Sequence, residues 1–185
     1  MKGKVALLDH ERESLFKHWL DQHGGMVVKV ARAYTLTADD RQDLTQEILL
    51  QVWRSLAQFE GRAAVSTWSY RVALNTALCW QRSQRSRPLA QQPGFAIQEV
   101  ADPGHDGGSS AEQKELVERL YAAIHRMSKG DAAIVLLYLD DLSYREIAEV
   151  LGISENNVGV KLNRAKKVLA ETMEGKSLEG NHGTR

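Results

Sequence analysis

A segment rich in proline, glycine and serine divides this sequence in two, and it constrains the fold more than any other feature. Residues 86–110 contain all three prolines, Pro88, Pro93 and Pro103, and a polar run follows the last of them. Proline removes a backbone donor and glycine favours turns, so this composition is typical of a connection rather than a packed element. We expect a flexible linker at 89–110 between two separately folded blocks.

Apolar residues on both sides of this segment recur at helical spacing. Leu44, Ile48 and Val52 repeat every fourth residue, and a further helix is expected from Ser66 to about Arg85. No run of alternating β-branched residues indicates a strand. The predicted fold class is therefore all-α. The expected organisation is a small helical bundle at 10–88, the linker, a second small helical domain at 111–174, and a flexible tail at 175–185.

Composition and apolar patterning exclude several classes of protein. The longest uncharged apolar runs fall far short of the roughly 20 residues that cross a bilayer, so we expect no membrane insertion. Asp9, His10 and Glu11 interrupt the short apolar stretch that a signal peptide would need, and we expect the chain to stay in the cytoplasm. Cys79 is the single cysteine, which excludes an internal disulfide. We expect it to be a small buried residue.

Local charge indicates two different surfaces in the first block, although Lys+Arg and Asp+Glu both number 24. The helix around Ile48 presents a polar, acidic outer face: Asp43, Gln46, Glu47, Leu50, Gln51 and Arg54. Between Gly61 and Gln98 there is no acidic residue but there are five arginines. Such a run can be a solvated helix end, but the aromatic side chains beside it favour nucleic acid.

The second block contains a helix, a sharp turn and another helix. Ser143 and Glu146 have the spacing of a capping box, and Gly152 supplies the positive φ that ends the first helix. Ser154 can cap the next helix. The residues expected on the buried side are Ile147, Ala148 and Leu151, with Ile153 at the corner. This arrangement is typical of the DNA-binding helix-turn-helix.

The last helix of the motif has an apolar inner face and a polar, basic outer face. Val158, Leu162, Ala165 and Leu169 fall within a narrow arc of the helix. The outward residues are Asn156, Val160, Asn163 and Lys167, flanked by Asn157 and Arg164. Asparagine can pair with adenine, arginine with guanine, and lysine suits phosphate. The alternative is an ordinary helical hairpin with a solvated polar face.

These motifs together resemble the extracytoplasmic-function (ECF) sigma factors of the sigma-70 family. The resemblance to region 2 lies in Asp43–Trp53, Phe59–Arg62 and Thr67–Asn75, in that order, and the resemblance to region 4 lies in Leu142–Ala148 and Asn157–Ala165. It covers roughly 15–87 and 112–174. It implies an all-α protein with region 2 and region 4 joined by the linker, and a promoter-recognition subunit rather than an enzyme.

The resemblance also implies partners and residue roles. Core RNA polymerase would be bound through its β′ clamp helices and β flap, with Asp43, Gln46, Glu47 and Leu50 docking on the clamp helices. The promoter −10 element would be recognised and melted by Phe59, Arg62, Trp68, Tyr70, Arg71 and Asn75. The −35 element would be read by Asn156, Asn157, Val160, Lys161, Asn163, Arg164 and Lys167. Relatives of this kind are usually held by an anti-sigma factor, and none of these roles needs a cofactor or metal.

Gly159 departs from the family pattern, because Gly159-Val160 replaces a commoner Lys-Ser pair. Glycine inside a helix costs about 1 kcal/mol relative to alanine. We hypothesise that a close approach to DNA or polymerase requires it.

Two other functions are weighed against this one. A repressor or activator would sense a ligand through the first block and bind an operator through the second, without core polymerase. An enzyme finds less support, because the six histidines show no metal spacing and no nucleophile, base and orienting group cluster together. The sequence Gly175-Lys176-Ser177 ends like a phosphate-binding loop but lacks the earlier glycine and a preceding strand.

Overall fold

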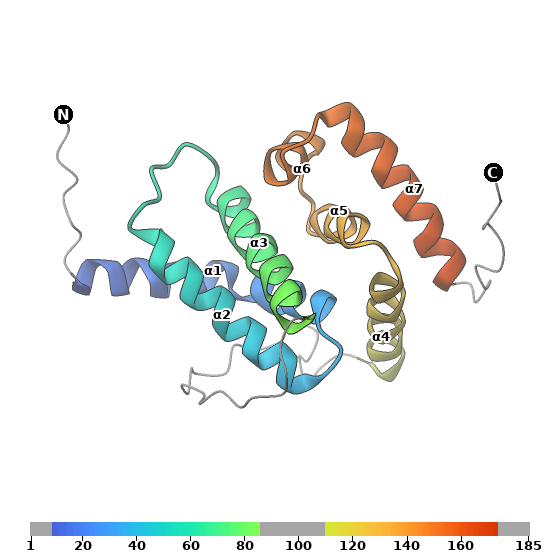
Figure 1. Ribbon diagram of the computed structural model, residues 1–185, viewed down its shortest axis with the longest axis horizontal. Helices are drawn as coiled ribbons and strands as arrows, with labels where there is room; N and C mark the ends of the chain where they lie inside the picture. The colour runs from blue at the N-terminus through green and yellow to red at the C-terminus, as the bar shows by residue number, and fades with distance from the viewer. Residues whose placement is uncertain (1–8, 86–109, 174–185) are drawn as a thin grey trace. The chain divides into compact units, whose positions relative to one another are not determined.

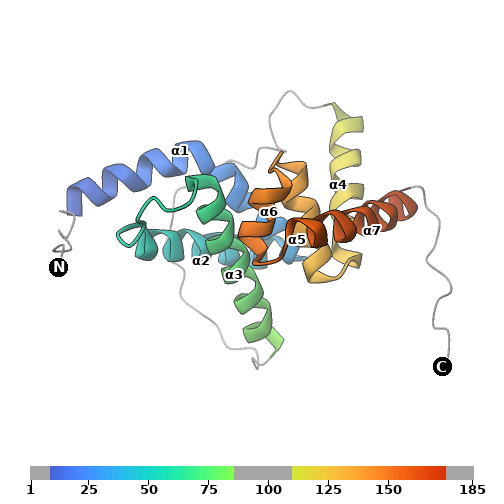
Figure 2. The same cartoon turned by 90° about the horizontal axis from the view of Figure 1, so that it is seen from above.

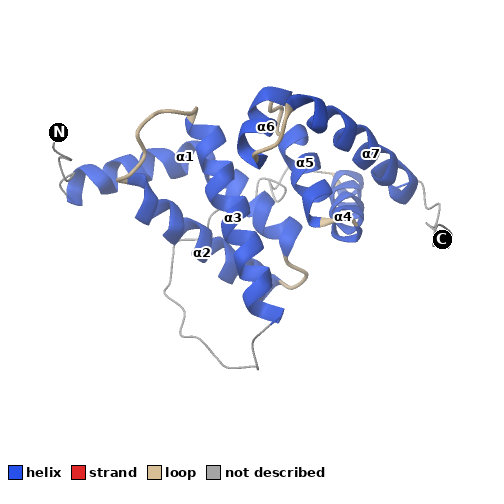
Figure 3. Ribbon diagram, turned by 45° about the horizontal axis from the view of Figure 1, so that its top comes forward, coloured by secondary structure: helices blue, strands red, loops and turns tan. Residues whose placement is uncertain are grey.

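The computed structural model describes residues 9–85 and 110–173, and its helices fall into two units (Figure 1). The first unit contains α1 (Asp9–Tyr34), α2 (Ala38–Leu56) and α3 (Val65–Arg85). The second contains α4 (Ala111–Arg126), α5 (Lys129–Leu139), α6 (Tyr144–Leu151) and α7 (Glu155–Met173). No strand occurs in the described residues (Figure 3), and the predicted all-α fold is confirmed.

The three helices of the first unit pack against one another around a shared core. Val27 and Val30 of α1 and Leu44, Ile48 and Val52 of α2 are fully buried. Two long-range hydrogen bonds join α3 to α1 at opposite ends: Trp19 Nε1 donates to Ser69 Oγ at 2.7 Å, and Gln81 Nε2 donates to the Tyr34 carbonyl at 2.7 Å. The core and these bonds together fix the face that α3 turns outward.

Helix α1 is the element that sequence reasoning did not anticipate. It continues through Gly24 and Gly25, although glycine inside a helix is unfavourable by about 1 kcal/mol relative to alanine. Gly24 is buried. Farther toward the start of α1, Arg12 donates to the Trp53 carbonyl at 2.6 Å and lies 4.3 Å from the centre of the Trp53 ring. Tertiary packing on α2 and α3 therefore outweighs local propensity in this helix.

In the second unit α7 packs against the other three helices, α4, α5 and α6 (Figure 2). The six consecutive residues 132–137 of α5 are all buried, so this short helix is covered on every side. Helix α6 contributes Ile147, Ala148 and Val150, while Leu151, which was expected on the buried side, is half-buried. Val158, Leu162 and Ala165 of α7 are fully buried, as predicted.

Local capping chemistry sets the helix boundaries of the second unit. Ser110 forms a capping box with Gln113, and Ser143 forms one with Glu146. Ser128 accepts from the backbone N–H of Asp131 at 3.2 Å. Gly152 has φ 67° and ends α6, and the N–H of Ile153 donates back to the Ala148 carbonyl at 3.1 Å. The Ser143 capping box and the positive φ at Gly152 confirm the predicted start and end of α6.

One predicted burial is wrong, and one apolar side chain of the second unit is exposed. Cys79 is exposed on α3 rather than buried, because the buried positions of that helix fall on other sides of it. Leu116 of α4 is 54% exposed, although it continues the apolar stripe that Ala123 and Ile124 bury. The predicted linker, apart from Ser110, and the predicted tail lie outside the described residues. Among the described helices, none is both long and apolar enough to cross a membrane.

Candidate nucleic-acid interface

The outer face of α2 carries the residues predicted to dock on the polymerase. Asp43 and Leu50 are exposed, and Gln46 and Glu47 are half-buried. The Glu47 carboxylate accepts from Gln51 Nε2 at 2.8 Å, one turn along the helix. The opposite side of α2 is buried at Leu44, Ile48, Leu49 and Val52. The acidic face is thus held on a rigid helix and presented to solvent.

Residues 57–64 form the loop between α2 and α3, shown as a tan loop in Figure 3. The half-buried Phe59 ring lies 4.9 Å from the Trp68 ring, centre to centre, at an angle of 43°. Gly61 has φ 69° and permits the reversal of the chain. The next residue, Arg62, lies 2.5 Å from the Glu60 carboxylate, and both side chains are largely exposed. An aromatic pair therefore anchors a loop whose charged side chains reach solvent.

Helix α3 presents an exposed stripe with a spacing of one turn. Arg71, Asn75, Cys79 and Arg82 are exposed and follow one another along this side. The half-buried Trp68 precedes them at the start of the helix. The structure therefore places Trp68, Arg71 and Asn75, which the resemblance assigned together to the −10 element, on one continuous side of α3 next to the loop.

Tyr70 differs from the other residues predicted to contact the −10 element, because its side chain is only 5% exposed. The sequence placed it with Trp68 and Arg71 as a residue in contact with DNA. In the folded unit it lies on the same side of α3 as the fully buried Ala73 and Ala77. Its ring is part of the core here and is not available for stacking on a base in this conformation.

The helix-turn-helix is formed by α6, the turn 152–154 and α7. The backbone N–H of Asn157 donates to Ser154 Oγ at 3.3 Å, which caps α7 as predicted. Hydrogen bonds from the Ser143 hydroxyl and from its backbone N–H lower the pKa of Glu146, and the nearby Arg145 adds to this effect. A fixed turn between two capped helices places α7 with its polar side outward.

All seven residues predicted to read the −35 element are exposed on α7. They are Asn156, Asn157, Val160, Lys161, Asn163, Arg164 and Lys167. Val160 is 71% exposed, which is unusual for a branched apolar residue in the middle of a helix. Amides, cations and one apolar contact on a single helix match the chemistry of a major groove.

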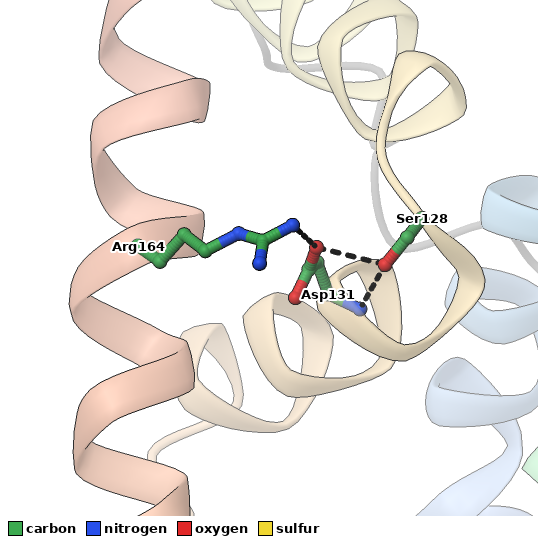
Figure 4. A network of polar contacts seen from close by, with 3 residues as sticks. All are labelled: Ser128, Asp131 and Arg164. Carbon is green, nitrogen blue, oxygen red and sulfur yellow. Dashed lines mark hydrogen bonds and ion pairs between the residues drawn. The ribbon is translucent and has the colours of Figure 1, made fainter. Parts of the chain in front are cut away.

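Two contacts on this helix were missed by sequence reasoning, because they join residues that are far apart in the chain. Arg164 Nη2 lies 3.9 Å from Asp131 Oδ2 at the start of α5 (Figure 4). The ammonium group of Lys166 lies 3.7 Å from the centre of the Tyr138 ring at the end of α5. Asp131 could be recognised from sequence only as part of a cap.

Gly159 does not make room for another part of this chain. A Cβ atom added there would lie 3.6 Å from Cε2 of Tyr144, an ordinary van der Waals distance. The helix geometry does not require glycine either, since no positive φ occurs at this position. Neither steric room nor backbone geometry in the described residues therefore explains a glycine at this position.

The described residues contain no group of three or more His, Cys, Asp or Glu side chains placed to hold a metal ion.

Comparison with known proteins identifies the same two segments. Residues 19–87 match the family described as Sigma-70 region 2, and residues 117–169 match Sigma-70, region 4. The chain is 31% identical over 154 residues to the ECF RNA polymerase sigma-E factor of Haemophilus influenzae, covering 76% of this chain and 79% of that protein. It is 31% identical over 136 residues to the ECF RNA polymerase sigma factor SigX of Bacillus subtilis, covering 72% and 70%.

A probable RNA polymerase sigma factor, RfaY of Xanthomonas campestris, is 34% identical over 145 residues, which are 76% of this chain and 36% of that longer protein. The solved structures that share the fold include two complexes. CnrH, in complex with the cytosolic domain of CnrY, gives a TM-score of 0.63 at 20% identity, covering 89% of this chain and 91% of that chain. The sigma factor RpoE of Bartonella quintana, in complex with the anti-sigma factor NepR, gives a TM-score of 0.65 at 18% identity. The match covers 88% of this chain and 98% of that chain.

Proposed function

This chain belongs to the ECF sigma factors of the sigma-70 family, and on that premise we propose that it binds core RNA polymerase and directs it to promoters through −10 and −35 elements. As a sigma factor it is a transcription initiation factor and not an enzyme. The seven exposed residues on α7 carry most of the support for promoter reading. We place its action in the cytoplasm, where the polymerase and the chromosome lie.

Core polymerase binds the acidic face of α2 in this proposal. Asp43, Gln46, Glu47 and Leu50 contact the β′ clamp helices, and the second unit contacts the β flap. An exposed leucine surrounded by carboxylates and an amide fits an interface with a small apolar centre and a charged rim. Rim charges of this kind chiefly set the association rate and the choice of partner.

The −10 element is melted at the loop 57–64 and the exposed stripe of α3. Extruding a base from the stack costs a few kcal/mol. Stacking on an aromatic side chain returns about 1–3 kcal/mol per base, and Phe59 and Trp68 provide two such rings. Arg62, Arg71 and Asn75 hold the strand through its phosphates and base edges. Melting then proceeds without ATP. Tyr70 supports this surface from the core.

The −35 element is read as duplex by α7. Asn156, Asn157, Asn163 and Arg164 lie toward base edges, Val160 meets a thymine methyl group, and Lys161 and Lys167 bind phosphates. The two elements bind two units of one chain, so each contact raises the effective concentration of the other.

An anti-sigma factor regulates the chain in this proposal. Both structural neighbours were solved with a bound protein, and for RpoE that protein is described as an anti-sigma factor. A protein bound over the outer face of α2 or over α7 would block polymerase or promoter.

Transcription in vitro with purified core polymerase and a genomic promoter library tests the proposal. We expect defined start sites that appear only when the full chain is added. Asp43→Lys should weaken core binding about tenfold, about 1.4 kcal/mol, whereas Asp21→Lys, at an exposed acid on α1, should not. Absence of any chain-dependent start site would refute the proposal, and equal effects of the two substitutions would refute the assigned docking face.

A further inference from the structure

The network of Ser128, Asp131 and Arg164 places a carboxylate beside the reading helix (Figure 4). Helix α7 has no acidic residue between Asn156 and Ala170. The acid that reaches its flank comes instead from α5, where Asp131 Oδ2 lies 3.9 Å from Arg164 Nη2. A negative charge next to a DNA-binding face weakens the attraction for phosphates, so its presence needs a physical reason.

Asp131 is held firmly, while Arg164 is not. The Asp131 side chain is 14% exposed, and its Oδ2 accepts from Ser128 Oγ at 2.7 Å. The Asp131 backbone N–H donates to the same Ser128 oxygen at 3.2 Å, so the carboxylate belongs to the first turn of α5. The Arg164 side chain is 76% exposed and makes its contact at the long limit of an ion pair.

The energy of this ion pair limits the role that it can have. An exposed ion pair contributes about 0–1 kcal/mol, too little to lock an arginine or to hold the domain together. A fixed carboxylate at this distance still biases where the guanidinium lies. It also competes with the DNA backbone for the same cation, because a phosphate would otherwise be the strongest partner nearby.

We propose that Asp131 is a positioning residue for promoter selectivity: it keeps Arg164 from binding phosphates and directs the guanidinium toward base edges. This inference rests on the proposed function, since it takes α7 as the helix that reads duplex DNA. A phosphate contact adds affinity for every sequence, whereas a base contact adds affinity for one. Asp131 therefore lowers the affinity for DNA of any sequence and raises the preference for the promoter sequence.

Asp131→Asn in the full chain tests this proposal, because an asparagine oxygen can still accept from Ser128. On a random-sequence duplex, we expect its affinity to rise by up to about fivefold. The slope of log affinity against log salt should steepen by up to about 1, the value for one added phosphate contact. With core polymerase, the ratio of affinities for a selected promoter and for the same duplex with a scrambled −35 element should fall by a similar factor.

Three further variants separate positioning from general charge and from folding. In an Arg164→Ala background, Asp131→Asn should change neither the slope nor the ratio. Asp131→Glu, which retains the carboxylate, should preserve the wild-type ratio. Glu171→Gln removes one negative charge from an exposed position two turns farther along α7 and should change the slope less. Melting temperatures of all variants show whether the fold is intact.

The inference is overturned if Asp131→Asn leaves slope and ratio unchanged, if its effect persists without Arg164, or if Glu171→Gln reproduces it. A wild-type chain that binds no duplex in either assay overturns it as well. If the chain binds random duplex but starts no transcript with core polymerase, the proposed function fails while the random-duplex assay still decides the role of Asp131.

Discussion

Asp141 is the one non-glycine residue with a positive φ, 59°, in the described ranges 9–85 and 110–173. It follows α5 and lets the N–H of Leu142 donate back to the Leu137 carbonyl at 3.1 Å, a pattern that satisfies the last carbonyls of a helix. This conformation costs an L-residue roughly 1–2 kcal/mol, and aspartate tolerates it better than most. The residue sets the entry to the helix-turn-helix.

We expect Asp141→Gly to stabilise the protein by about 0.5–1 kcal/mol, because relief of the left-handed strain exceeds the backbone entropy that glycine adds to the unfolded chain. Asp141→Val should destabilise it, since a branched side chain is strained at positive φ. Thermal unfolding of the two variants measures both. A melting temperature that falls equally in both would contradict the strain argument.

Gly159 yields a second prediction at this scale. A methyl group there would meet only the Tyr144 ring at an ordinary distance, so Gly159→Ala should stabilise α7 by up to about 1 kcal/mol. The melting temperature of a domain this size would rise by roughly 4–8 °C. If DNA or polymerase approaches the helix here, promoter-directed transcription should fall at the same time. Unimpaired transcription would refute the close-approach hypothesis.

At the scale of the helices, sequence predicted what local chemistry decides. The capping box of Ser143 and Glu146 lies within four consecutive residues and sets the start of α6, and Gly152 sets its end. Both ends of this helix could therefore be predicted from the sequence. Helix α1 could not, because Gly24 and Gly25 favour a break and only tertiary packing overrides them. The burial of Tyr70 and the exposure of Cys79 could not be predicted either. Both depend on the rotation of α3 about its own axis, which its contacts with α1 and α2 determine. The contact between Asp131 and Arg164 depends on how α5 crosses α7.

The capping box of α6 predicts a pH dependence. The Ser143 hydrogen bonds lower the pKa of Glu146 from its usual 4.5 in the folded state. Its charge therefore adds stability that is fully present above 4.5 and is lost as the pH falls through the lower folded value. Glu146→Gln keeps an acceptor but no charge. Wild type should be more stable than this variant near neutral pH, by a few tenths to about 1 kcal/mol.

Denaturant unfolding of both proteins across the acid range measures this difference. The two stabilities should converge at low pH, where the carboxyl group is protonated. A difference that stays constant down to the lowest pH, or grows there, would show that the charge of Glu146 does not support the cap.

The exposed stripe of α3 offers a direct probe of the −10 surface. Cys79 is the single cysteine and lies one turn beyond Asn75 on the same side of the helix. A small maleimide should label it readily in the purified chain. In the complex with core polymerase and a melted promoter, we expect labelling to slow about tenfold or more, because the DNA strand covers the stripe. Equal labelling in the presence and absence of promoter would place the strand elsewhere.

At the scale of the whole molecule, surfaces with different chemistry lie on two units of one chain. The acidic side chains and the exposed leucine on α2 suit a protein partner. The aromatic rings of Phe59 and Trp68 in the first unit, and the amide and cationic side chains of α7, suit DNA. Most of this division could be predicted from the helical spacing of charge. A repressor or activator would share the helix-turn-helix but would have no need of the polymerase.

Promoter binding with and without core polymerase tests this account most directly. The affinity of the full chain would be measured on a promoter duplex selected by transcription and on the same duplex with its −35 and −10 elements scrambled. We predict that the chain discriminates between the two duplexes only when core polymerase is present. A chain that selects the promoter equally well alone would contradict the account and favour a repressor or activator.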